Sequence, residues 1–545
     1  MNLEIIEHHQ QQVLEAFSRG EFDQIEIIGE ADEKEFFELC FGEKILARLA
    51  EAMPTDRKKE EVPLWFELAA NLSLKLHLEN SYSAFERVVQ CGGLLSAMPP
   101  DLASKHLDAQ TQQIWIQCRG FNDKNHYPRK MPCDDDTLRK AVKDVSSERW
   151  QEWFNGAVQA AFQEYGFFDP RGIFVADATY LFVPDNPQYE GSVVMWFDEH
   201  NHPVDYDKLS AEDRKKAHRE RCYKLVSLLH LRGEHYVYAG LRVVSGKVHE
   251  DTVLAPMVEQ FVQAVGKGVM KLLIMDRGFI DGKNLGRCKQ EWGVDVLIPM
   301  KRNMDIWADA WALGAREPWQ KVAVAAPPAK PPAPGRPPLI ARREAKRQAT
   351  LARRRPAPDP AEVLTQHEYC WLEGFTSWSA LPVPINVLLI RERYADGHCR
   401  EWALMTTRPY TQPPQARTDY QHRPKIEERH RQLKCFHDLS DFQSRSQNVM
   451  VAQVVFILLS YTLRQWQLWR LHGEAPPEET PELMRRRLNL RKQYVVIYLA
   501  RSYAQVPLVR FTRLVLELDG AARERALAKI RKLEQSLLNP QDDTS

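Results

Sequence analysis

The chain has 545 residues, of which 44% are hydrophobic, and it carries 74 acidic and 74 basic side chains. This composition indicates a folded protein of about two to four domains and excludes a chain that is disordered throughout. The formal net charge of zero excludes a protein that its overall field draws to nucleic acid, so any such binding must be local.

Cysteine usage and apolar patterning predict a reducing, cytoplasmic setting. The nine cysteines are scattered and form no C-x-x-C pair, which argues against a zinc ribbon or a disulfide framework. The polar start MNLEIIEHHQQQ does not resemble a signal peptide. The longest apolar run, 449–463, is too short to span a bilayer, so we expect a buried helix there and no membrane partner.

The first two regions of the chain differ in their patterning. Residues 1–150 predict a helical region, and the basic and aromatic residues mixed at 113–132 make it a candidate for binding DNA ends, although a plain surface loop is also compatible. Residues 151–302 alternate apolar strand patterns, such as GIFVADATYLFV and MKLLIMD, with helical ones. That alternation predicts a mixed α/β sheet with covered faces, the first part of a core domain.

Three further regions follow. Residues 303–407 predict a β-rich insertion that contains a Pro- and Arg-rich linker at 322–360. Residues 408–472 predict the second part of the core, and residues 473–545 a helical C-terminal region. The segment 408–513 holds eighteen Lys and Arg against nine Asp and Glu, which favours local binding to a polyanion.

The stretch YQHRPKIEERHRQLK, residues 420–434, predicts a helix that begins just after Pro424. Its spacing places Arg423, Glu427 and Lys434 on one face, with Tyr420 at the entrance. One carboxylate among two cations and a phenol suits a site that holds a metal and grips phosphate. An exposed helix with ordinary ion pairs is the alternative.

Three carboxylates, one of them on this helix, are candidates for a shared metal site. Asp177 and Asp276 each end an apolar strand pattern, and Glu427 lies on the later helix. Carboxylates at the carboxyl ends of strands face the ligand crevice of an open α/β sheet, and three together need divalent cations to offset their repulsion. Oxygen ligands favour Mg²⁺, with Mn²⁺ able to substitute, and two ions about 3.5–4 Å apart activate phosphodiester chemistry. A strand end and a helix cap are the plain alternatives for Asp177 and Asp276.

The series VADATYL, MDRGFID and Y-x2-R-x3-E-x6-K, in this order over residues 172–470, resembles the DDE transposases of bacterial insertion sequences. It is most similar to the group with the Y-R-E-K signature and a β-rich insertion. The resemblance implies an RNase H-like core with Asp177, Asp276 and Glu427 as catalytic, metal-binding residues. It also implies that the other three residues of the signature, Tyr420, Arg423 and Lys434, bind DNA.

The same resemblance implies the partners. These are double-stranded DNA, as terminal inverted repeats and as target, and a second copy of the chain in a homodimer on that DNA, which would place the protein at the bacterial nucleoid. Lys301 and Arg302, just after a core strand, are further candidate DNA contacts. Trp371, Trp378 and Trp402 of the insertion are candidates either for stacking on a flipped base or for core packing.

Two other functions remain open from the sequence. One is a domesticated relative that only binds DNA, against which the presence of all three carboxylates argues. The other is a structure-selective nuclease on the same core. The Pro- and Arg-rich stretch at 322–360 lengthens the insertion beyond the family pattern, which leaves the role of the insertion open.

Overall fold

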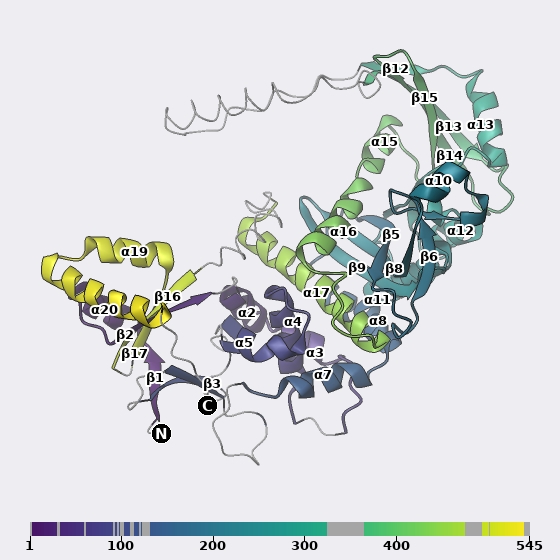
Figure 1. The fold of residues 1–545 in the computed structure, drawn as a ribbon. Coiled ribbons are helices and arrows are strands. Elements are labelled where there is room, and N and C mark those ends of the chain that lie inside the picture. Colours follow the sequence, from purple (N-terminus) through teal and green to yellow (C-terminus); the bar gives the residue numbers. More distant parts are fainter. Residues whose placement is uncertain are drawn as a thin grey trace.

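The computed structural model describes most of the chain, and the elements below belong to those residues (Figure 1). The described residues are 3–29, 33–58, 61–90, 93–94, 98, 103–108, 114–118, 121, 131–323, 364–474, 493–500 and 502–538. The Pro- and Arg-rich stretch lies outside them except for its first two residues, and so does most of 113–132.

A large mixed sheet forms the centre of the molecule, which confirms the predicted α/β class with helices towards both ends of the chain. Its strand order is β12-β13-β14-β15-β11-β10-β5-β8-β6-β7, with β9 paired to β8. The core strands are β5 (Ile173–Val183), β6 (Val193–Phe197), β7 (Pro203–Val204), β8 (His218–Arg232), β9 (His235–Ser245), β10 (Leu272–Ile274) and β11 (Asp295–Pro299). Only the pairs β5–β10 and β10–β11 are parallel among those described in this sheet.

The two faces of this sheet are covered by different helices. Phe174 and Ala176 of β5 pack into a core with α11 (Glu250–Val265), α12 (Gly282–Gln290) and α13 (Asp305–Gly314). Val175 and Leu181 belong to the opposite core, with α17 (Gln447–His472) and the N-terminal helices. Because side chains alternate along a strand, Asp177 lies on the same face as Val175, towards α17 and its preceding helix.

The predicted β-rich insertion is an extension of the central sheet. Its strands are β12 (Gln320–Ala323), β13 (Leu364–Phe375), β14 (Ile385–Tyr394) and β15 (Cys399–Thr406). β15 pairs antiparallel with β11, which joins the insertion edge to edge with the core. The predicted hairpin turn at 395–398 is confirmed, with Gly397 at φ 88°, a left-handed conformation that glycine adopts without strain.

A second sheet joins the two ends of the chain, in the order β2-β16-β17-β1-β3-β4. Two predictions were therefore wrong in part, because residues 1–150 and 473–545 contain strands beside their helices. The apolar run YVVIYL, predicted as helix, is strand β16, which pairs with β2 and β17. These strands are β1 (Leu3–His8), β2 (Gln24–Gly29), β3 (Ala103–Asp108), β4 (Ile114–Cys118), β16 (Gln493–Leu499) and β17 (Ser502–Pro507).

The remaining helices lie at both ends of the chain and around the core. Those before the core are α1 (Gln10–Ser18), α2 (Glu33–Gly42), α3 (Ile45–Ala50), α4 (Leu64–Leu76), α5 (Phe85–Gln90), α7 (Asp135–Asp144), α8 (Ser147–Trp153) and α9 (Gln159–Glu164), and those after it are α19 (Leu508–Glu517) and α20 (Gly520–Leu538). The short α10 (Ala211–Lys216) lies between β7 and β8.

The apolar run at 449–463 forms part of α17, which at 26 residues is longer than the run itself. By length and composition α17 is the one described helix that could cross a membrane, yet 94% of its most apolar window is buried inside the protein. It packs against β9, α8 and α4 as a central core helix.

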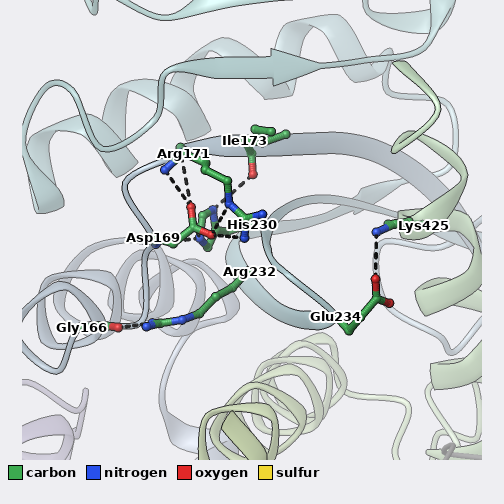
Figure 2. Close-up of polar contacts among 9 residues, drawn as sticks. Gly166, Asp169, Arg171, Ile173, His230, Arg232, Glu234 and Lys425 are labelled. Carbon is green, nitrogen blue, oxygen red and sulfur yellow. Dashed lines mark hydrogen bonds and ion pairs between the residues drawn. The ribbon is translucent and has the colours of Figure 1, made fainter. Parts of the chain in front are cut away.

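A buried histidine fixes the start of β5, the strand that carries Asp177 (Figure 2). His230 Nε2 accepts the backbone N–H of Asp169 at 3.0 Å, and Nδ1 lies 3.2 Å from the carbonyl of Ile173. The ring must therefore be neutral, with its proton on Nδ1. Burial lowers the pKa of His230 to about 4.

This histidine predicts acid sensitivity. Its pKa in the folded protein lies below the ordinary value of about 6.5, so the unfolded chain binds a proton that the folded protein excludes. Stability should fall as pH drops from about 6.5 towards 4, by about 1–2 kcal/mol at pH 5. The check is denaturant unfolding at pH 7 and pH 5 for wild type and His230→Gln, with the exposed His200→Gln as control. Equal pH dependence in wild type and His230→Gln would contradict the assignment.

Candidate active site

The register between β5 and β10 brings two aspartates together. Ile274 pairs with Val175 in the parallel ladder. Asp177 and Asp276 each lie two residues further along the chain, so they stand at the same level of the two neighbouring backbones. Neighbouring strands are about 5 Å apart. The prediction that Asp177 ends its strand was wrong, because antiparallel pairing with β8 carries β5 on to Val183.

Asp276 lies just beyond the end of its strand, whereas Asp177 lies within its strand. β10 stops at Ile274, and Asp276 caps the following helical turn by accepting the backbone N–H of Arg277 at 2.6 Å. The helix-cap alternative for Asp276 is thus real, but it occupies only one carboxylate oxygen, Oδ1. The other oxygen, Oδ2, lies 3.1 Å from Nη2 of Arg423.

The third carboxylate comes from α16 (Pro424–Phe436), which lies over this face of the sheet. Pro424 stands at the first helical position, where its missing N–H costs nothing, so α16 begins where the sequence predicted. The preceding short helix α15 (Pro414–Tyr420) ends at Tyr420. Arg423 occupies the N-cap position of α16 without a side-chain capping bond, and Glu427 follows one turn later on the same side.

A single guanidinium joins the three carboxylates. Arg423 Nη2 lies 3.4 Å from Asp177 Oδ1 and 3.1 Å from Asp276 Oδ2, and Nη1 bonds Glu427 Oε1. Burial works to lower the pKa of Arg423, but the three carboxylates outweigh burial and raise it. The Asp177 side chain is 11% exposed, whereas those of Asp276 and Glu427 are 43% and 48% exposed.

The donor set, one carboxylate from each of three elements, fits a divalent cation. Among the described residues, no three acidic, histidine or cysteine groups lie close enough to form a metal site as they stand. The Arg423 guanidinium lies between the carboxylates and acts there as a stand-in cation. Hard carboxylate oxygens on three elements suit Mg²⁺ or Mn²⁺ once that guanidinium moves out.

His430, which the sequence reasoning missed, backs the buried aspartate. Its Nε2 lies 2.8 Å from Ser227 Oγ, and its Nδ1 lies 3.6 Å from Asp177 Oδ2. Ser227 pairs with Asp177 across β5 and β8, so sheet and helix confine the carboxylate from two sides. Among the described residues the buried Nδ1 has no hydrogen-bond partner, and the nearby carboxylate is that of Asp177. The spacing Glu427, His430, Lys434 follows one helix face and was the available signal.

Lys434 lies further along the same face. Its Nζ donates to Thr179 Oγ1 at 2.7 Å, two residues beyond Asp177 on β5. Burial lowers the pKa of Lys434 to about 8, and the Asp177 charge opposes that shift. The site thus gathers two cations against three carboxylates.

A cleft of about 540 Å³ opens beside these residues, between the core and the insertion. Tyr420 and Asp276 line it from the core, and Trp402 and Arg400 line it from β15. The Tyr420 and Trp402 rings are 6.1 Å apart. Burial raises the pKa of Tyr420 to about 12, so its phenol keeps its proton and can donate a hydrogen bond.

Other residues predicted from the sequence lie at greater remove. Lys301 and Arg302 follow Pro299, which lines the cleft, and Arg302 donates to the Glu401 carbonyl at 3.1 Å. All three tryptophans of the insertion pack against the hydrophobic cores, and among them Trp402 also lines the cleft.

Comparison with known proteins places this chain in a recognised family. Residues 170–463 match the family model described as "Transposase DDE domain", a span that contains all three carboxylates. A search of curated proteins finds no match. One similar solved structure is a cryo-EM structure of a piggyBac transposase synaptic complex with hairpin DNA, at 10% identity, covering 92% of this chain and 85% of that one. Its TM-score of 0.30 is too low to support a conclusion about this chain.

Replacing Arg423 should expose its role as a stand-in cation. Arg423→Gln leaves the carboxylates without their shared partner, so the free protein should lose about 1–3 kcal/mol of stability. Mn²⁺ should bind about tenfold more tightly, because it no longer displaces a guanidinium. Calorimetric titration with Mn²⁺ checks this, with Arg431→Gln, an exposed arginine of the same helix, as control. Mn²⁺ affinity that stays unchanged or falls in Arg423→Gln would contradict the role.

Proposed function

Because the chain belongs to the family of DDE transposase domains, we propose that it cuts DNA at the ends of a transposable element and joins those ends to target DNA. The observation that carries this proposal is the convergence of Asp177, Asp276 and Glu427 on one guanidinium. Carboxylates that already share a cation are arranged to share a divalent one, which DDE transposases generally use.

In the proposed mechanism the protein orients the reacting groups. Divalent ions, Mg²⁺ or Mn²⁺ and two in number in our proposal, would supply an activated nucleophile and stabilise the leaving oxygen. Asp177 is fixed by burial and by His430, whereas the half-exposed Asp276 and Glu427 stand on the solvent side. The substrate phosphate therefore enters from their side.

The signature residues would hold the DNA. Arg423, once released from the carboxylates, can turn its planar guanidinium towards a phosphate. Tyr420 donates from a neutral phenol inside the cleft. Trp402 offers a ring on the opposite wall, where an unstacked base could lie. Lys434 would act closer to Asp177, and Lys301 and Arg302 beyond the cleft.

Finer assignments are part of the same proposal. The spacing Y-x2-R-x3-E-x6-K, together with strands inserted between β11 and α16, supports the insertion-sequence group that carries this signature. We propose a homodimer that holds two terminal inverted repeats, at the nucleoid of a bacterial cell. A relative that only binds DNA would have no need to keep three carboxylates around one cation.

The decisive variant, Glu427→Gln, replaces one carboxylate oxygen of the site with an amide nitrogen. Glu427→Gln keeps the shape of the side chain but removes its charge, so the variant should bind a duplex of the DNA flanking the gene as the wild type does. Cleavage in Mg²⁺ should slow by at least about a hundredfold. Gel-resolved cleavage of end-labelled duplex measures this.

Glu428→Gln is the matched control, because Glu428 lies on the same helix and pairs with Arg431 away from the three carboxylates. It should cleave at the wild-type rate. Cleavage by Glu427→Gln at that same rate would end the assignment, and binding without cleavage by the wild type itself would favour the DNA-binding relative.

A further inference from the structure

A second cleft, of about 530 Å³, lies where the N-terminal helices meet the core. Five segments line it: the turn at 80–83, helix α7, the loop after β5, the loop between α16 and α17, and the first turns of α17. Its cationic lining residues are Arg139, Lys143 and Arg445, and most of the other lining side chains carry hydroxyl or amide groups. The cleft shares no lining residue with the one beside Asp276.

Hydrogen bonds fix the walls of this cleft. Asn80 Nδ2 donates to the carbonyls of Asp438 and Asp441, at 2.9 and 2.8 Å, and so ties the turn to the loop after α16. Asn448 Nδ2 donates to the Lys143 carbonyl at 3.0 Å, which ties α7 to the start of α17. The cleft is therefore built before any ligand arrives, which lowers the entropic cost of binding.

The lining of this cleft carries a small excess of positive charge, with three cations against two carboxylates. Among the described residues Lys143 makes no ion pair, and the Arg445 guanidinium bonds the amide oxygen of Gln188 rather than a carboxylate. The two carboxylates of the lining, Glu190 and Asp135, accept the backbone N–H groups of Gln447 and Asp136 and keep their negative charge. Among the described residues, neither forms an ion pair with Lys143 or Arg445.

The basic cluster around His230 shows the contrast (Figure 2). There Arg171 pairs with Asp169, and Lys425 lies 3.8 Å from Glu234. Arg171 and Lys425 are thus each paired with a neighbouring carboxylate, whereas Arg232 donates to the Gly166 carbonyl. In the cleft, by contrast, the Lys143 ammonium and the Arg445 guanidinium have no carboxylate partner among the described residues, so both can pair with an anionic ligand.

The position of the cleft relative to the carboxylates suggests the ligand. From Asp177 to Val183, β5 covers about 20 Å, and the loop that follows it lines the cleft. α16 runs the same way, since Arg423 contacts Asp177 and Lys434 contacts Thr179. A DNA duplex advances 3.4 Å per base pair, so a duplex that lay along β5 would reach the end of this strand about six base pairs from Asp177.

We propose that this cleft binds the phosphate backbone of the transposon-end duplex about six base pairs from the cut bond. The inference rests on the proposed function. Lys143 and Arg445 supply the charge, and the hydroxyl and amide side chains bond phosphate oxygens, as in contacts that position a duplex without reading its sequence. The duplex would then be gripped at two points, the carboxylate site and this cleft, which sets its direction across the protein.

The salt dependence of binding tests the proposal. Each phosphate contact contributes about 0.9 to the slope of log K against log salt concentration. The double variant Lys143→Ala/Arg445→Ala should therefore lose about 1.8 from the slope, and bind a 30-base-pair duplex of the element's end about ten- to a hundredfold more weakly near 100 mM NaCl. Fluorescence anisotropy at several NaCl concentrations measures both quantities, and circular dichroism confirms that the variant is folded.

Charge-retaining and distant variants are the controls. Lys143→Arg/Arg445→Lys should keep the wild-type slope, and Lys267→Ala, an exposed lysine between α11 and β10, should change it little. A methylphosphonate about six base pairs from the cut bond should weaken binding by the wild type but not by the double alanine variant. A wild-type slope in the double alanine variant overturns the cleft assignment alone. A wild type that neither binds nor cuts the element's ends overturns the proposed function itself.

Discussion

Repulsion among three carboxylates is the constraint on which this site depends. β5, β10 and α16 bring Asp177, Asp276 and Glu427 to one place, and like charges so close persist only with positive charge between them. In the free protein Arg423 supplies that charge. The sheet register aligns Asp177 with Asp276, and the proline that starts α16 positions Arg423 and Glu427. The neutral His230 holds the start of β5, the strand that contains Asp177.

Under the proposed function, metal binding and DNA binding would be linked through Arg423. Its guanidinium cannot hold the three carboxylates and a DNA phosphate at once. A divalent ion that takes over the carboxylates frees the guanidinium, and a phosphate that attracts the guanidinium opens the carboxylates to the ion. Such coupling is reciprocal, so each ligand should strengthen the binding of the other. Asp177, buried against His430, stays in position throughout.

Sequence patterns could predict the elements that carry the site, because those elements have local signals. Helix α16 is signalled by Pro424 at its first position and by the helical spacing of Arg423, Glu427 and Lys434. β5 and β10 are signalled by apolar runs that lead to aspartates. Helical and strand periodicity also contained His430 and Thr179, which share faces with Glu427 and Asp177. Non-local pairing was not accessible. The run YVVIYL becomes strand β16 only because β2, more than 460 residues earlier in the sequence, pairs with it, and the wall formed by Trp402 and Arg400 depends on β15 joining β11.

The most direct measurement of the central claim is anomalous X-ray scattering from crystals of the protein soaked in Mn²⁺. The account predicts an anomalous peak bounded by oxygens of Asp177, Asp276 and Glu427, with the Arg423 side chain turned away from them. A structure at saturating Mn²⁺ that shows no peak there, with Arg423 still between the three carboxylates, would contradict it.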